Sequence, residues 1–196
     1  MNMEDRVAIF IDGSNLYHAL RSTFGRTNLN FAEFTKKLCF SRRLFRTYYY
    51  NVSQDPVQRP DAYREQQEFL STLRNTPYLE VRLGNTKLAQ GVPVEKGIDI
   101  MLATDLLYFA WNDSYDVAIL VSGDSDFAYA LQAVKNMGKH VEVAYFETGV
   151  SKDLLNVTDN RYLLDRQFFN GLWIVNLRPK RRRAIVKPQK QDHTNA

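Results

Sequence analysis

The chain has 196 residues, of which 44% are hydrophobic and 13% aromatic, enough for one globular domain with a sizeable core. Nine Gly, six Pro and 24% charged residues exclude a disordered chain and a collagen-like fibre. The longest apolar runs are strand-length, so we expect no helix of the roughly 20 residues that a membrane span needs. The first residues are acidic where a secretory signal would be basic, and the single Cys39 can form no internal disulfide, so we expect a cytoplasmic protein.

The net charge of +4 is unevenly distributed along the chain. Residues 178–196 hold seven basic side chains against the single acid Asp192, which leaves residues 1–177 with a net charge of −2. This segment also contains two prolines and few large apolar residues. We therefore expect a folded domain over 1–177 and a basic, flexible tail over 178–196, which either aids solubility or attracts nucleic acid.

The N-terminal half of the chain predicts three strands and three helices. An apolar run over residues 6–11 ends in an Asp-Gly pair and is typical of a strand buried on both faces. The polar segment 85–95 contains Gly91 and Pro93 and is expected to be a loop. Further strands are expected over 43–51 and 78–84, and helices over 15–24, 31–40 and 61–74.

The C-terminal half continues the alternation of helices and strands. A helix over 97–111 carries apolar side chains nearly all round, which predicts that it is well buried. Strands are expected over 115–121 and 139–146, and helices over 126–137 and 151–157. Strands alternating with helices imply a parallel sheet covered on both faces. The predicted fold class is therefore α/β, with three α/β/α layers and a mostly parallel sheet of five strands.

Four acidic residues stand where a parallel sheet collects functional groups. Asp12 follows the first strand, Asp124 and Asp126 follow the fourth, and Asp99 begins the helix over 97–111. If the two strands are neighbours, these carboxylates meet at one edge of the sheet. Each also has a structural interpretation, as a turn residue, a helix cap or an acid in the first turn of a helix. Asp105, in mid-helix, is expected to pair with a buried base such as Lys96 or Arg46.

The chemistry follows from the four acids taken together. Four ionised carboxylates in one cleft repel one another unless a cation neutralises them, and Mg²⁺ or Mn²⁺ prefers oxygen ligands. The three histidines are scattered and there is one cysteine, so no zinc site is expected. Paired divalent ions activate water for phosphodiester hydrolysis. The predicted catalytic residues, which are also the predicted metal ligands, are Asp12, Asp99, Asp124 and Asp126.

The sequence lacks the motifs of several other common enzyme classes. The chain has no Walker-type loop, no dinucleotide-binding glycine fingerprint and no nucleophile elbow. Asp12-Gly13-Ser14 lacks the second Asp, two residues on, of an aspartyl-phosphate phosphatase of the haloacid dehalogenase type. A small-molecule phosphatase therefore stays a weaker alternative.

Three motifs stand out along the chain: FIDGSN over 10–15, EKGID over 95–99 leading into the apolar helix with Asp105, and LVSGDSDF over 120–127. Together they resemble the NYN domain in its LabA-like branch, which belongs to the wider PIN-like nuclease group. The resemblance runs from about Val7 to Asp165. It implies a PIN-like fold and a metal-dependent ribonuclease that favours single-stranded RNA, with Asp12, Asp99, Asp124 and Asp126 matching the metal-binding set of the family.

The resemblance also implies supporting residues around the four acids. Asn15 could orient Asp12 or a metal-bound water through its amide, and Ser122 could hold a carboxylate or a substrate phosphate. Lys96 could contact the scissile phosphate, although a role as the partner of Asp105 is an equal alternative.

RNA must be gripped by bases outside the acidic cleft, because a domain of net charge −2 repels phosphate. Tyr48, Tyr49 and Tyr50 are expected mainly in the core, with one near the strand end able to stack on a base. A non-catalytic regulator that binds RNA or a protein on the same fold is the rival hypothesis, and a homo-oligomer is left open. The candidate nucleic-acid-binding bases are Arg42, Arg43, Arg59, Arg64, Arg82, Lys87 and, in the tail, Arg181, Arg182 and Arg183.

Overall fold

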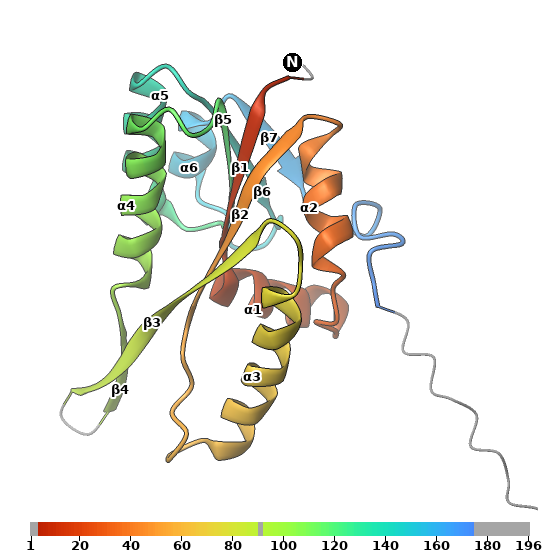
Figure 1. Cartoon of the computed structure of the whole chain (residues 1–196), viewed down its shortest axis with the longest axis vertical. Coiled ribbons are helices and arrows are strands. Elements are labelled where there is room, and N and C mark those ends of the chain that lie inside the picture. Colours follow the sequence, from red (N-terminus) through yellow and green to blue (C-terminus); the bar gives the residue numbers. More distant parts are fainter. Residues whose placement is uncertain (1–3, 90–91, 175–196) are drawn as a thin grey trace, which may run out of the picture.

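The computed structural model describes residues 4–89 and 92–174, without the side chains of 85–96. Over these residues the chain forms a sheet in the order β4-β3-β2-β1-β5-β6-β7, with helices on both faces (Figure 1). All strands except β4 run parallel to one another, and β4 pairs antiparallel with β3 in a hairpin at the edge of the sheet. The strands are β1 (Arg6–Asp12), β2 (Arg43–Val52), β3 (Leu79–Ala89), β4 (Val92–Lys96), β5 (Val117–Val121), β6 (His140–Tyr145) and β7 (Asn160–Leu163).

The helices divide into two layers. Helices α1, α2 and α3 cover one face of the sheet, and α4, α5 and α6 cover the other (Figure 1). A short 3-10 turn, η1 (Ser125–Phe127), leads from β5 into α5. The helices are α1 (Gly13–Phe24), α2 (Phe31–Cys39), α3 (Pro60–Arg74), α4 (Ile98–Trp111), α5 (Ala128–Asn136) and α6 (Lys152–Val157).

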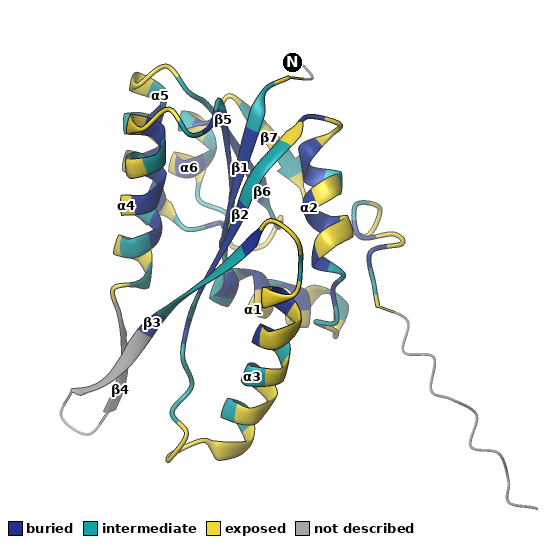
Figure 2. Cartoon of the chain, in the orientation of Figure 1, coloured by how far each residue is buried: buried dark blue, intermediate teal, exposed yellow. Residues whose placement is uncertain are grey.

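The central strand β1 separates two apolar clusters. Its side chains alternate, so that Val7, Ile9 and Ile11 face the α1/α2/α3 layer while Ala8 and Phe10 face the α4/α5/α6 layer. All five are fully buried, which explains why the sequence of this strand is apolar without alternation. Figure 2 shows the buried strands between the two partly exposed helix layers.

The three consecutive tyrosines of β2 divide between the same two clusters. Tyr48 and Tyr50 pack on the α4 side, and Tyr49 packs against Phe31 and Phe69 on the other side. All three are buried. The expectation of core packing is confirmed for the whole group.

The predicted α/β class and three-layer arrangement are confirmed, but the predicted number of strands is wrong. The segment 85–95, expected as a loop, continues β3 to Ala89 and forms β4 from Val92, with residues 90–91 outside the described part. An edge hairpin needs no apolar face, so its polar sequence gave no strand pattern. The four-residue β7 alternates between half-buried and exposed positions at the opposite edge and was also missed. No helix of the described residues is long and apolar enough to span a membrane.

Candidate metal-binding site at the carboxyl ends of β1 and β5

Asp12 is the last residue of β1 and also the N-cap of α1. Its Oδ1 accepts the backbone N–H of Asn15 at 3.0 Å, which satisfies a free donor in the first turn of the helix. Its Oδ2 accepts the hydroxyl of Ser122 at 3.0 Å. Ser122 directly follows β5, and β5 lies beside β1 with Val121 opposite Ile11. The neighbouring strands therefore deliver both residues to one edge of the sheet.

Ser122 also connects Asp12 to the acids that follow β5. Its Oγ accepts the backbone N–H of Asp124 at 3.2 Å, and Asp124 Oδ1 in turn accepts the N–H of Asp126 at 3.0 Å. Asp124 thus caps η1 while it lies in the same hydrogen-bonded chain as Asp12. Asp12 and Asp124 are therefore helix caps and also members of the candidate site.

Two glycines of the motifs allow this close approach. A Cβ on Gly13 would lie 2.4 Å from Cζ of Tyr49 and 2.6 Å from the carbonyl oxygen of Tyr50. A Cβ on Gly123 would lie 2.6 Å from the carbonyl oxygen of Gly149. Real Cβ atoms do not approach other atoms this closely, so both positions require glycine for space rather than for backbone conformation. The two glycines keep the loops that carry Asp12 and Asp124 tight against their neighbours.

Asp99 joins the group from the α4 side. Gly97 has φ 83°, a left-handed conformation that turns the chain from β4 into α4, and Asp99 lies in the first turn of that helix. Burial raises the pKa of Asp99, and the negative charges of Asp124 and Asp126 raise it further. These interactions place Asp99 within electrostatic reach of both acids.

Burial likewise raises the pKa of Asp12 above its ordinary value. The hydrogen bonds from Asn15 and Ser122 oppose this shift because they stabilise the charged form, whereas the charges of Asp99 and Asp124 add to it. The four acids therefore form one group of mutually repelling carboxylates.

The donors of this group are all carboxylate oxygens, the ligand type preferred by Mg²⁺ and Mn²⁺. Among the side chains that the structure describes, no three His, Cys, Asp or Glu residues form a compact cluster. The residue types of the four acids fit a hard divalent cation.

Asp105 lies outside this group. Its Oδ2 accepts the hydroxyl of Tyr50 at 2.8 Å and pairs with Arg82. The Arg82 guanidinium also lies over the rings of Tyr48 and Phe109, at 5.0 and 5.4 Å from their centroids. Asp105 thus ties α4 to β2 and β3.

The expectation of a basic partner for Asp105 holds, but the partner that the structure describes is Arg82 from β3 and not Arg46. The register between β2 and β3 brings Arg82 opposite Tyr50, a long-range contact that no spacing in the sequence displays. The side chain of Lys96 lies outside the described part, as does that of Lys87.

Asn15 holds Asp12 through its backbone N–H, whereas the sequence suggested its side-chain amide. Ser122 holds a carboxylate, one of the two roles expected of it.

Arg42, expected to bind nucleic acid, is instead buried. Its guanidinium donates to both carboxylate oxygens of Glu142 at 2.8 Å, and the two side chains are 1% and 0% exposed. Arg43 is exposed but begins β2, so it lies at the amino edge of the sheet, opposite the edge that carries Asp12. The prediction is therefore wrong for Arg42, and Arg43 lies away from the site. The bases Arg181, Arg182 and Arg183, with the whole predicted tail, lie outside the described residues.

Beside Asp12, a cavity of about 470 Å³ opens between α1, the end of β2 and α3. Sequence reasoning missed it because its lining comes from separate segments with no shared motif. The only signal was the polar residues at the end of β2 and in the segment after it, which include Asn51, Gln54 and Arg59.

Known proteins resemble this chain in sequence and in fold. The NYN domain family model matches residues 6–165. The chain is 28% identical over 171 residues to the low amplitude and bright protein LabA of Synechococcus elongatus, covering 81% of this chain and 82% of that protein. A crystal structure of a protein of unknown function from Vibrio parahaemolyticus shares the fold with a TM-score of 0.70, at 24% identity over 86% of this chain and 98% of the other. The resemblance seen in the three motifs is thereby confirmed, and the chain belongs to the NYN domain family.

Proposed function

We propose that this protein is a metal-dependent ribonuclease that hydrolyses phosphodiester bonds of single-stranded RNA at the carboxyl edge of β1 and β5. The observation that carries the proposal is the hydrogen-bonded chain from Asp12 through Ser122 to Asp124, with Asp99 within electrostatic reach. Membership of the NYN family, in the PIN-like nuclease group, supports the same chemistry.

Asp12, Asp99, Asp124 and Asp126 would hold one or two Mg²⁺ or Mn²⁺ ions, which supply an activated water and stabilise the leaving oxygen. Burial and the repulsion between the acids raise the pKa of Asp12 and of Asp99, and a cation would oppose both effects by favouring the ionised carboxylates. A bound cation would reduce the mutual repulsion of the four carboxylates.

The residues of the chain fix the orientation of these ligands. Asp12 is held at both carboxylate oxygens, by Asn15 and by Ser122, so its side chain has little freedom to rotate. Asp124 is held at Oδ1 by the N–H of Asp126, which leaves its Oδ2 for a ligand. Ligands fixed in this way lose little entropy when an ion binds.

The proposal is tested by incubating the protein with end-labelled single-stranded RNA and Mn²⁺, in parallel with EDTA and with the variant Asp124→Asn. We expect cleavage with Mn²⁺ alone. Cleavage that persists both in EDTA and in Asp124→Asn would refute the site. Far-UV circular dichroism of the variant checks that the fold is intact.

A second candidate is a non-catalytic regulator that binds RNA or a protein through the same fold. It is compatible with membership of the NYN family, because a shared fold does not by itself fix a reaction. Tight RNA binding without turnover across Mg²⁺, Mn²⁺ and Ca²⁺ would support it. Hydrolysis of p-nitrophenyl phosphate instead of RNA would favour the phosphatase alternative.

A further inference from the structure

We propose that the cavity between α1 and α3 receives one nucleobase of the RNA, and so positions the strand on the neighbouring acidic site. The inference rests on the proposed function, because it takes RNA as the ligand. It assigns to this hollow a task that is distinct from that of the four carboxylates.

The cavity begins close to Asp12. Ser14, which lines it, is two residues from Asp12, so their Cα atoms lie at most about 7.6 Å apart. Tyr49, which also lines it, packs against Gly13. Burial raises the pKa of its hydroxyl, and the nearby charge of Asp12 adds to this shift. A strand with its phosphate at the acids can therefore place an adjacent base in the cavity.

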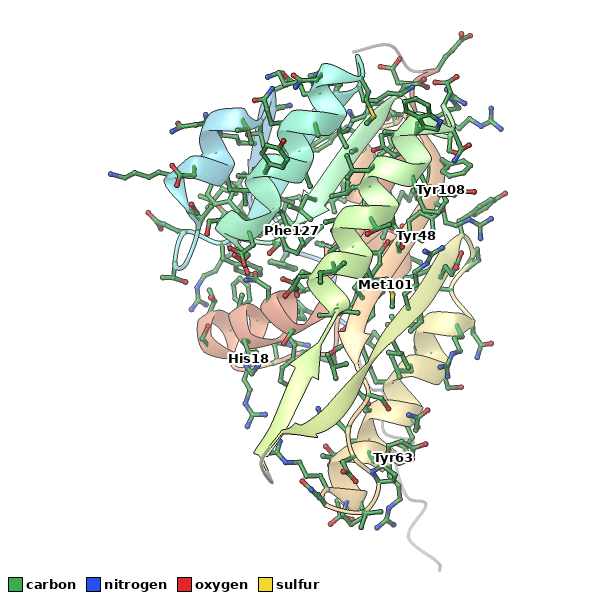
Figure 3. All side chains as sticks on the ribbon, turned by 90° about the vertical axis from the view of Figure 1, so that its left-hand side faces the viewer. His18, Tyr48, Tyr63, Met101, Tyr108 and Phe127 are labelled. Carbon is green, nitrogen blue, oxygen red and sulfur yellow. The ribbon has the colours of Figure 1, made fainter. Side chains whose placement is uncertain are left out.

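The interior offers aromatic and apolar contacts to a flat ring. Phe31, Phe69 and Tyr49 contact one another edge to face at centroid distances of 5.7 to 5.8 Å and form one wall. Tyr17, 40% exposed, and His18 stand on α1 at the rim, and Figure 3 labels His18 there. Exposed rings of this kind stack on bases of any sequence.

Two fixed amides supply hydrogen-bonding groups for the polar edge of a base. Asn51 donates to the Tyr49 hydroxyl at 3.1 Å and accepts the N–H of Val52 at 2.7 Å. Gln66 accepts the N–H of Gln54 and donates to the carbonyl of Val52, both at 2.8 Å. Each amide has two donor hydrogens and two lone pairs, so both keep groups for a ligand while these contacts fix their orientation.

The charged residues that line the cavity favour a base, and not a phosphate, in its interior. Glu65 lines the cavity and disfavours a phosphate inside it. Arg59 lines it too and is exposed, and no acidic side chain of the described residues pairs with it. The guanidinium of Arg59 is thus available for the sugar-phosphate backbone that follows the bound base.

The decisive experiment compares binding of a fluorescein-labelled RNA hexamer with binding of an abasic hexamer of equal length and charge. EDTA in all samples prevents cleavage. The wild-type protein should prefer the intact strand by about tenfold or more, the factor that stacking of one base provides. Ala62→Phe fills the cavity from α3 and should abolish this preference. Ala32→Phe, on the exposed side of α2 in a different hollow, should preserve it.

Two surface variants keep the test decisive if Ala62→Phe fails to fold. Tyr17→Ala removes an exposed ring at the rim and should also reduce the preference, whereas Tyr108→Ala, on the outer side of α4, should not (Figure 3). Arg59→Gln should weaken binding of intact and abasic RNA alike, while Arg74→Gln at the other end of α3 should weaken neither.

Variants Ala62→Phe and Tyr17→Ala that discriminate as well as the wild type would overturn the inference. This outcome would leave Mn²⁺-dependent cleavage and its loss in Asp124→Asn untouched. An absence of cleavage with an intact base preference would instead remove the ribonuclease proposal and leave the base site.

Discussion

The hydroxyl of Ser122 donates a hydrogen bond to the carboxylate of Asp12 at 3.0 Å, across 110 residues of sequence. The same oxygen accepts the backbone N–H of Asp124 at 3.2 Å. One small side chain thus connects the two acids that flank the central pair of strands. Removing the hydroxyl of Ser122 should break the link between Asp12 and Asp124 without disturbing the apolar core.

Ser122→Ala should therefore slow RNA cleavage at neutral pH. The hydrogen bond that favours the charged form of Asp12 is lost, so the pKa of Asp12 rises further. A hydrogen bond to a charged group contributes about 1.5–3 kcal/mol, which predicts a rate lower by roughly 10- to 100-fold. The measurement is the initial rate with saturating Mn²⁺. Ser22→Ala, on the exposed side of α1, is the control, and an equal rate in both variants would contradict the prediction.

Gly123→Ala should destabilise the protein and lower its activity together. The added Cβ meets the carbonyl oxygen of Gly149 at 2.6 Å, so one of the two loops must move. Overpacking of this kind costs about 1–3 kcal/mol of unfolding free energy. Urea denaturation measures the loss. Gly25→Ala, where the new Cβ meets nothing within 4 Å but φ is +67°, should cost less and leave cleavage unchanged.

Arg42→Met should lower the free energy of unfolding by about 3–5 kcal/mol, because it leaves the carboxylate of Glu142 buried without its basic partner. The hydroxyl of Tyr162, which donates to Glu142 at 3.1 Å, offsets part of the loss. Replacing both partners, as Arg42→Met with Glu142→Leu, should recover most of the stability. A double variant less stable than Arg42→Met would show that the charge of Glu142 is not the cause.

The surface pair of Arg6 and Asp116 predicts an acid-dependent contribution to stability. Hydrogen bonds from Arg6 lower the pKa of Asp116 to about 2, below the value of about 3.9 in an unfolded chain. A depressed pKa stabilises the fold above the unfolded value, and this stability is lost as the pH falls toward 2. The difference in unfolding free energy between wild type and Asp116→Asn should therefore shrink between about pH 5 and pH 2. A difference that is constant over this range would contradict it.

Much of the fold was accessible from the sequence because its inner strands are buried on both faces. Strands β1 and β5 are short apolar runs, β1 ending at Asp12 and β5 followed three residues later by Asp124, and this pattern located them. The edges of the sheet carry no such pattern. The polar hairpin β3/β4 and the four-residue β7 satisfy their backbone by pairing, which leaves little trace in hydrophobic periodicity.

The site was predictable only as far as topology could place strand ends. Asp12 and Asp124 were expected at one edge because both follow strands, and the pairing of β1 with β5 brings them there. The partner of Asp105 and the burial of Arg42 depend instead on register and on the long-range pairing with Glu142. A cavity lined from several segments is visible only once the layers have packed.

The long separation between Asp12 and Ser122 has a consequence for the newly made protein. During synthesis on the ribosome, a chain that has emerged only as far as β4 contains Asp12 but has nothing to lay beside the open edge of β1. The pairing of β5 with β1 completes the centre of the sheet and brings Ser122 and Asp124 to the edge that carries Asp12. A nascent chain that still lacks β5 therefore has no assembled group of carboxylates beside the messenger RNA from which it is being translated.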